Sequence, residues 1–261
     1  MRSSVLRYPS IIEHGGCGAK AETTAALFDA GFVVPPGVAV STRFAAAVLG
    51  ADPGDDVELI QRRIRGAEPS DVVADVLGEL TSEVLIVRSS SPCEDVGEHA
   101  SYGVYRSQVC DRAGLRDAML DCLVAAFEPA VVAYKRRLGL PIAEHPALLV
   151  QEFVAGQPSG VLLTRDIVRG QRDRMLLEVT EGPCSEVTSG SVVPSTYARD
   201  RQGGPVESIA GADRFTEHDL QPLFELGLAI SKTLGYEVDV EFTVAPGGPV
   251  VLQARRLPGG R

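Results

Sequence analysis

Four polar residues near the C-terminus have the types and spacing to hold a metal ion beside a phosphate. In the segment EVDVEFTV, apolar and polar residues alternate strictly, which predicts a strand with one buried and one polar face. The loop APGGP and the run VVLQAR follow, so we expect an antiparallel hairpin. If the turn centres on Gly247, Glu241 lies opposite Gln253 and Asp239 lies opposite Arg255. Directly opposed residues share a face, so these four groups would converge.

This combination of two carboxylates, an amide and a guanidinium suits magnesium and phosphate. Mg²⁺ binds few protein oxygens and completes its shell with water and phosphate oxygens, while an arginine braces a phosphate. Cross-strand ion pairs on an exposed hairpin would explain the same pattern without any ligand. The hairpin alone leaves both interpretations open.

Several further strands and helices, which would position other functional side chains, are predicted from the sequence. The run Glu83–Arg88 (EVLIVR) predicts a buried strand that opens into the polar loop SSSPCEDVGEHAS. Helix formers over Ala21–Ala30 end at Gly31, and FVVPPGVAV then predicts a turn and a short strand. Further strands are expected over Ala147–Val154, Gly160–Thr164 and Arg174–Thr180. The sequence TEHD, Thr216–Asp219, predicts a capping box that opens a helix ending at Gly235.

Length and composition bound the class of protein. A chain of 261 residues is one large domain or two small lobes. The net charge of −10 argues against a nucleic-acid binder but not against a nucleotide, because Mg²⁺ screens a triphosphate locally. No apolar run is long enough to span a bilayer, and nothing argues for export. The five cysteines form no CxxC pair, so we expect reduced, mostly buried thiols and a cytoplasmic location.

A collinear series of motifs gives these elements a common interpretation. In order along the chain they are GGCGAKAETTAALFDAGFVVPPG, VRSSSPCEDVGEHASYG, VQEFVAGQPSGVLLTRD, SEVTSGSVVPSTY, DVEFTV and VLQARRLP. The series resembles the ATP-grasp nucleotide-binding domain of the pyruvate phosphate dikinase and phosphoenolpyruvate synthase family, and is similar to the ATP domain of rifampin phosphotransferases. Each motif alone is weak, but the resemblance covers nearly the whole chain.

The resemblance implies an α+β fold of the ATP-grasp type, with two lobes and the nucleotide in the cleft between them. The N-terminal lobe would span residues 1–148. The C-terminal lobe would span residues 149–261 and include the hinge and the metal-binding hairpin. ATP and Mg²⁺ are the implied cofactors.

The same resemblance assigns roles to residues of the first lobe and the hinge. Arg88 would contact a phosphate, and Ser101 and Gly103 would belong to a small-residue loop over the phosphates, where glycine lets backbone N–H groups approach an anion. In the hinge, backbone groups would read the adenine edge and an apolar side chain would pack on its ring; the residues concerned are Gln151, Glu152, Phe153 and Val154.

On the hairpin, the resemblance makes Asp239 and Glu241 the metal-site acids and Gln253 their amide partner. Arg255 would follow the transferred phosphate. The glycine turn departs from the family pattern, because Cys17 stands where a lysine follows the paired glycines. Lys20, one helical turn away, is the candidate to replace it in catalysis and phosphate binding.

A second departure lies before SGSVVPSTY, where Ser185 takes the place of an expected acid and Glu186 is adjacent. Neither a P-loop nor a catalytic-triad order offers a competing site. Three functions fit the sequence. The first is an ATP-dependent phosphotransferase acting on a small molecule or on a histidine of a separate phosphohistidine-domain protein. The others are an ATP-grasp ligase forming an acyl phosphate and a non-catalytic nucleotide-binding subunit. We expect no nucleic-acid or membrane partner, and we expect any acceptor histidine to come from a separate protein.

Overall fold

The computed structural model describes residues 4–50, 54, 56–91, 106–212 and 214–258. The described helices are α1 (Tyr8–His14), α2 (Gly18–Asp29), α3 (Thr42–Leu49), α4 (Val57–Arg65), α5 (Ser70–Glu79), α6 (Leu115–Ala125), α7 (Pro129–Arg137), α8 (Cys184–Thr188) and α9 (Glu217–Leu234). The described strands are β1 (Val5–Arg7), β2 (Gly37–Val40), β3 (Val84–Ser90), β4 (Ser107–Asp111), β5 (Ala147–Glu152), β6 (Ser159–Leu163), β7 (Arg174–Thr180), β8 (Ser195–Asp200), β9 (Glu207–Ala210), β10 (Val238–Ala245) and β11 (Gly248–Arg256).

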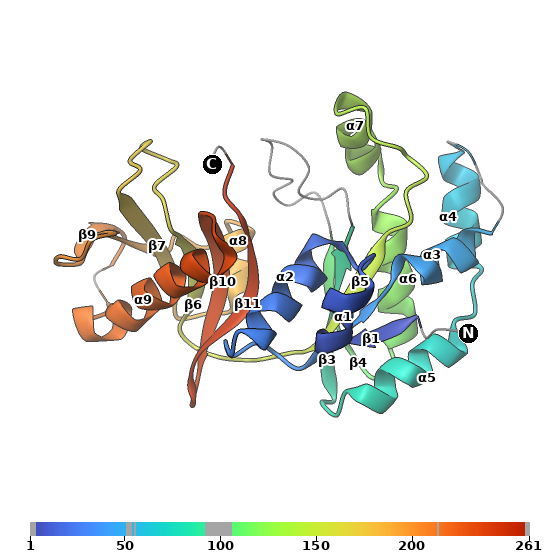
Figure 1. The fold of residues 1–261 in the computed structure, drawn as a ribbon, viewed down its shortest axis with the longest axis horizontal. Helices are drawn as coiled ribbons and strands as arrows, with labels where there is room; N and C mark the ends of the chain where they lie inside the picture. The colour runs from blue at the N-terminus through green and yellow to red at the C-terminus, as the bar shows by residue number, and fades with distance from the viewer. Residues whose placement is uncertain (1–3, 51–53, 55, 92–105, 213, 259–261) are drawn as a thin grey trace. The chain divides into compact units, whose positions relative to one another are not determined.

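The chain forms two compact units, each with its own sheet. The first contains residues 1–29 and 36–153, and the second contains residues 30–35 and 154–261. The short segment Ala30–Pro35 joins the second unit, where the carbonyl of Val33 accepts a hydrogen bond from the amide of Val251 at 2.9 Å. The predicted lobe boundary after residue 148 stays a prediction. The α+β class expected from the sequence is confirmed, with antiparallel sheets and separate helices in both units (Figure 1).

In the first unit, helices pack on both faces of an antiparallel sheet of order β1-β2-β5-β3-β4. Alternate residues of β3 face opposite sides. Leu85 and Val87 lie in a core with residues of α3 to α6. Arg88 and Ser90 face the other side, where α2 packs on β3 and β5. The last residues of β3 therefore lie beside the start of α2 rather than on an open sheet face.

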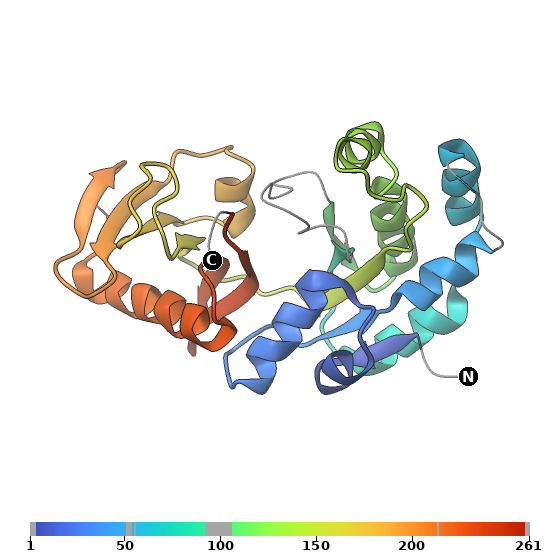
Figure 2. The same cartoon turned by 45° about the horizontal axis from the view of Figure 1, so that its top comes forward.

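In the second unit, one long helix packs on a sheet of order β11-β10-β6-β7-β8-β9 (Figures 1 and 2). Helix α9 contacts β6, β10 and β11. The sheet residues that face α9 are almost fully buried and apolar, and they include Leu162, Met175, Leu177 and Val240. Phe224 of α9 is fully buried as well. Gly227 of α9 lies against Leu162, where an added Cβ would come within 2.0 Å of a methyl carbon.

The capping signals predicted for α9 are confirmed. The Thr216 hydroxyl accepts from the Asp219 amide at 3.3 Å, and the Asp219 carboxylate accepts from the Thr216 amide at 2.9 Å. The helix ends before Gly235, whose φ of 76° is left-handed. Within the described residues, no helix is long and apolar enough to cross a bilayer.

Candidate functional site

The C-terminal hairpin has the residue pairing that the sequence predicts. Asp239 of β10 lies opposite Arg255 of β11, and Glu241 lies opposite Gln253. The turn is one half-residue earlier than assumed, because Ala245 pairs with Gly248. A bulge in the register between Glu241 and Phe242 makes up the difference. Four polar side chains therefore share one face of the sheet, opposite to the face that α9 covers.

The opposed side chains contact one another directly. Arg255 Nε donates to Asp239 Oδ2 at 2.9 Å, and Gln253 Nε2 lies 3.4 Å from Glu241 Oε1. Asp239 is 2% exposed and Gln253 is 6% exposed, whereas Glu241 is half-buried. A charge buried this deeply needs a partner, which Arg255 supplies.

The donor set on the hairpin fits Mg²⁺. The carboxylates of Asp239 and Glu241 and the amide oxygen of Gln253 lie on one face of the two paired strands and are hard oxygen donors, of which Mg²⁺ needs few. Among the described residues, no group of three or more histidine, cysteine, aspartate and glutamate side chains is placed to hold a metal ion. The hairpin thus suits an ion that takes its remaining ligands from water and phosphate better than one held in an all-protein cage.

The same sheet face continues across β6 and β7. Glu241 pairs with Val161 of β6, and Val161 pairs with Glu178 of β7. Leu163 and Leu176 lie beside them on the same face, one pair further along. Burial raises the pKa of the Glu178 carboxyl. Glu178 is not among the site residues predicted from the sequence, although it is the single acid within the apolar strand RMLLEVT.

In the first unit, Arg88 is near the end of β3 and is 8% exposed. It pairs with Leu149 of β5 on one side and Ser107 of β4 on the other. The next residue, Ser89, accepts a hydrogen bond through its carbonyl from Lys20 Nζ at 3.1 Å. The structure therefore brings Lys20 to the strand end that carries Arg88, two residues that lie 68 positions apart in the sequence.

The glycine turn before α2 lies against the same strand end. Gly18 has a φ of 78°, and a Cβ there would lie 1.8 Å from the Ser90 carbonyl oxygen. The Ser90 hydroxyl donates to the Cys17 carbonyl at 2.6 Å and accepts from the Ala21 amide at 3.0 Å. Only glycine permits this approach at position 18, so the turn and the strand end are fixed together.

Cys17 itself is packed inside the unit. Its side chain is fully buried, and its amide donates to Glu22 Oε1 at 3.2 Å. Burial, with the nearby Glu22 charge, raises the pKa of the thiol to about 11. The thiol is therefore neutral at physiological pH and cannot replace a lysine ammonium. The four described cysteines, Cys17, Cys110, Cys122 and Cys184, carry thiols that form no disulfide with one another.

The predicted hinge residues lie at the end of β5, where the chain leaves the first unit after Phe153. Gln151 is fully buried, and its amide donates to the Tyr8 hydroxyl at 3.1 Å. Glu152 accepts from the amides of Thr81 and Ser82 at 2.8 and 3.0 Å. Burial opposes ionisation of Glu152, but these hydrogen bonds prevail and lower its pKa.

Two hinge amides are also engaged within the first unit. The Glu152 amide donates to the Pro36 carbonyl at 2.8 Å, and the Phe153 amide donates to the Val84 carbonyl at 3.0 Å. Phe153 and Val154 have half-buried side chains. Ser101 and Gly103 lie outside the described residues. Ser185 is exposed in α8, and the adjacent Glu186 is half-buried.

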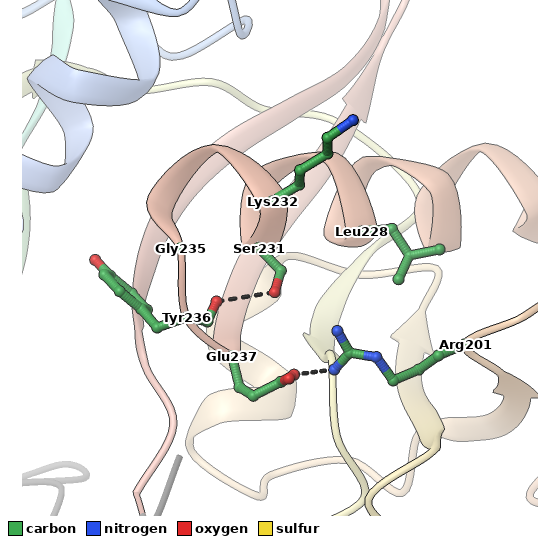
Figure 3. Close-up of a pocket in the computed structure, with 7 residues that line it drawn as sticks. All are labelled: Arg201, Leu228, Ser231, Lys232, Gly235, Tyr236 and Glu237. Carbon is green, nitrogen blue, oxygen red and sulfur yellow. Dashed lines mark hydrogen bonds and ion pairs between the residues drawn. The ribbon is translucent and has the colours of Figure 1, made fainter. Parts of the chain in front are cut away.

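A separate pocket of the second unit contains none of the predicted site residues. It is lined by Arg201, Leu228, Ser231, Lys232, Gly235, Tyr236 and Glu237 (Figure 3). Arg201 forms an ion pair with Glu237, and the Ser231 hydroxyl donates to the Tyr236 carbonyl at 2.8 Å (Figure 3). The Ser231 bond connects the end of α9 to the segment before β10, and the Arg201–Glu237 ion pair connects that segment to the residue after β8. Both contacts have a structural role.

Comparison with known proteins identifies relatives of this chain. The family model described as pyruvate phosphate dikinase, AMP/ATP-binding domain, matches residues 59–213. An uncharacterized phosphotransferase, YvkC of Bacillus subtilis, is 26% identical over 92% of this chain and 33% of its own length. A probable phosphoenolpyruvate synthase of Methanothermobacter thermautotrophicus is 25% identical over 93% of this chain and 44% of its own length. The rifampicin phosphotransferase of Bacillus subtilis is 25% identical over 80% of this chain and 28% of its own length.

The chain thus spans less than half the length of these curated relatives. Among solved structures, the L-amino acid ligase of Bacillus licheniformis matches with a TM-score of 0.44 and 14% identity, over 94% of this chain and 44% of that one. The D-alanine-D-alanine ligase of Coxiella burnetii matches with a TM-score of 0.42 and 11% identity, over 97% of this chain and 50% of that one.

Proposed function

Because the chain belongs to the pyruvate phosphate dikinase AMP/ATP-binding domain family, we propose that it binds Mg-ATP and acts as an ATP-dependent phosphotransferase. The acceptor in this proposal is a small molecule or a histidine on a partner protein. The observation that carries the proposal is the hairpin register, because it puts two carboxylates, an amide and a guanidinium of the expected motif on one face.

In the proposed site, Asp239, Glu241 and Gln253 hold Mg²⁺, which when bound neutralises part of the phosphate charge. Arg255 orients the Asp239 carboxylate through the 2.9 Å hydrogen bond from its Nε. The Gln253 side chain orients Glu241 in the same way. These contacts fix the acids before ligand arrives, and such preorganisation is the main source of catalysis in phosphoryl transfer.

The proposed phosphate-binding cations are Arg88 and Lys20. This assignment is supported by the hydrogen bond from Lys20 Nζ to the carbonyl of Ser89, the residue next to Arg88. The glycine turn is bonded to the same strand end through the Ser90 hydroxyl. A guanidinium and an ammonium at one strand end would together neutralise part of the charge of a polyanion. In the same proposal, the segment 151–154 contacts the adenine.

The buried Cys17 favours a second candidate, a nucleotide-binding subunit without catalytic activity. The family's lysine is absent at this position, and the thiol that replaces it is fully buried and neutral. This loss removes one cation from the phosphate site. Binding of ATP would survive it more easily than phosphoryl transfer, because transfer needs charge neutralisation in the transition state.

The deciding experiment follows ATP with Mg²⁺ by phosphorus NMR, with the protein alone, with small-molecule acceptors and with histidine-bearing partner domains. AMP formed only with a partner domain supports a split dikinase. ADP formed with a small molecule supports a direct kinase or an ATP-grasp ligase that forms an acyl phosphate. ATP binding without any product under all conditions selects the non-catalytic subunit and overturns the preferred function.

A further inference from the structure

Glu178 lies on the same sheet face as the hairpin acids but on the far side of an apolar strip. The register runs from Glu241 to Val161 and on to Glu178, so two strand spacings separate the two acids. That separation is about 10 Å between the backbone positions. Leu163 and Leu176, together with Val161, form the apolar strip beside this line.

The environment of Glu178 differs from that of the other acids on this face. Asp239 is paired with Arg255, and Glu241 is hydrogen-bonded to Gln253. Glu178 is half-buried in the strand, directly opposite Thr196 of β8, and burial alone accounts for its raised pKa. A carboxylate kept in a partly dry place gains most from a ligand that brings hydrogen-bond donors to it.

The chemistry of a nucleotide matches this arrangement. A triphosphate held by a metal ion on the hairpin is followed by a sugar, whose vicinal hydroxyls are the first hydrogen-bond donors beyond the phosphates. A carboxylate is an acceptor at both oxygens and can receive two adjacent hydroxyl groups. On the line between the two acids the sheet presents the apolar Val161, so the metal-site acids and Glu178 are separate polar contact points.

We infer that Glu178 binds the sugar hydroxyls of the nucleotide and makes the site selective for ribonucleotides. This inference rests on the proposed function, because it assumes that the hairpin holds a Mg-triphosphate. It assigns a specificity role to a strand position that lies two strands away from the metal-site residues.

The test is calorimetry of the full chain with ATP, 2′-deoxy-ATP and 3′-deoxy-ATP, each with Mg²⁺. The unmodified protein should bind ATP about tenfold more tightly than at least one deoxy analogue, the effect of one charge-assisted hydrogen bond. Glu178→Leu should weaken ATP binding by about the same factor and leave that analogue unchanged, so the ratio falls to about one.

Two further variants keep the test sharp. Glu178→Gln retains the shape and one acceptor, and it should reduce the ratio only in part. Glu207→Gln, which removes the same charge from an exposed residue of β9, should leave the ratio unchanged. Because burial disfavours the Glu178 carboxylate, Glu178→Leu should melt no earlier than the parent, which separates a binding role from a structural one.

Each result decides one of two questions. If ATP binds but the ratio is unchanged in Glu178→Leu, or if the unmodified protein shows no preference for ATP, the inference about Glu178 is wrong and the proposed function stands. If the unmodified protein binds no nucleotide with Mg²⁺, the proposed function fails first and the inference fails with it.

Discussion

The two sheets carry their candidate chemistry in different ways. In the second unit, the acids project from one face of a sheet, and strand register alone decides which side chains meet. In the first unit, helices pack on both faces of the sheet, and the cations lie where β3 ends against the start of α2. One arrangement depends on pairing between strands, and the other depends on how a helix packs on a strand. Substitutions in the two units should therefore differ in how strongly they affect stability and ATP binding.

The largest effect is expected where a candidate ligand also neutralises a buried charge. Asp239→Asn removes a carboxylate that is 2% exposed and leaves the 15%-exposed Arg255 without its counter-ion. We expect loss of Mg-dependent ATP binding together with a fall of about 3 kcal/mol in the free energy of unfolding. Urea unfolding and calorimetry measure the two effects.

The double variant Asp239→Asn with Arg255→Gln serves as the control. Removing both charges should restore part of the stability but none of the metal-dependent binding, because the two variants share one interaction. If Asp239→Asn binds Mg-ATP like the parent, Asp239 and Arg255 form only a structural ion pair. The hairpin of the second unit would then carry no metal site.

Glu241 offers a cleaner separation of function from stability. It is half-buried and lies against the neutral amide of Gln253, so Glu241→Gln removes a charge at nearly constant shape and from a less buried position than Asp239. We expect metal-dependent ATP binding or turnover to fall about 100-fold, with an unchanged unfolding midpoint. A Glu241→Gln variant with unchanged ATP binding and turnover would show that Glu241 is a surface residue of the strand without a role in metal binding.

A smaller effect is expected in the first unit, where two cations share the phosphate role. Lys20→Met removes one ammonium while Arg88 remains, so ATP affinity should fall about tenfold. The matched control is Lys232→Met, which removes the same charge from an exposed residue of α9. Equal losses in both variants would mean that only overall charge matters, and no loss in Lys20→Met would exclude Lys20 as the substitute for the missing lysine.

The contrast between the units also explains which features were predictable. The pairs Asp239–Arg255 and Glu241–Gln253 followed from strand alternation and a glycine turn, although the turn position was off by half a residue and the bulge corrected it. Nothing in the sequence marks that bulge, since Leu252 is an ordinary strand residue. Without it, Glu241 would face Leu252, and register would put Gln253 on the other side.

The first unit was less predictable because its contacts are tertiary. The approach of Gly18 to Ser90 and the bond from Lys20 to Ser89 join segments about 70 residues apart, and no local periodicity encodes them. The hydrogen-bond partners of Gln151 and Glu152 were not predicted for the same reason, because they come from segments about 70 or more residues away in the sequence. Local signals predicted the strands here but not which side chains they bury.

The smallest effect is expected where the sequence signal was purely local. Thr216→Ala removes the hydroxyl that accepts from the Asp219 amide at the start of α9, leaving a helix N-terminal donor without its cap. An N-cap threonine contributes about 1 kcal/mol to stability, so the unfolding midpoint should fall by about 2 °C. Because α9 packs on the face of the sheet opposite to Asp239 and Glu241, ATP affinity should be unchanged within twofold, roughly the error of one weak contact. Thermal unfolding and calorimetry on the same preparation check both statements.

Thr216→Ser, which retains the cap, should behave like the parent. A Thr216→Ala variant that lost ATP binding in proportion to stability would show that the two faces of this sheet are coupled, and that the register of the hairpin depends on the helix behind it.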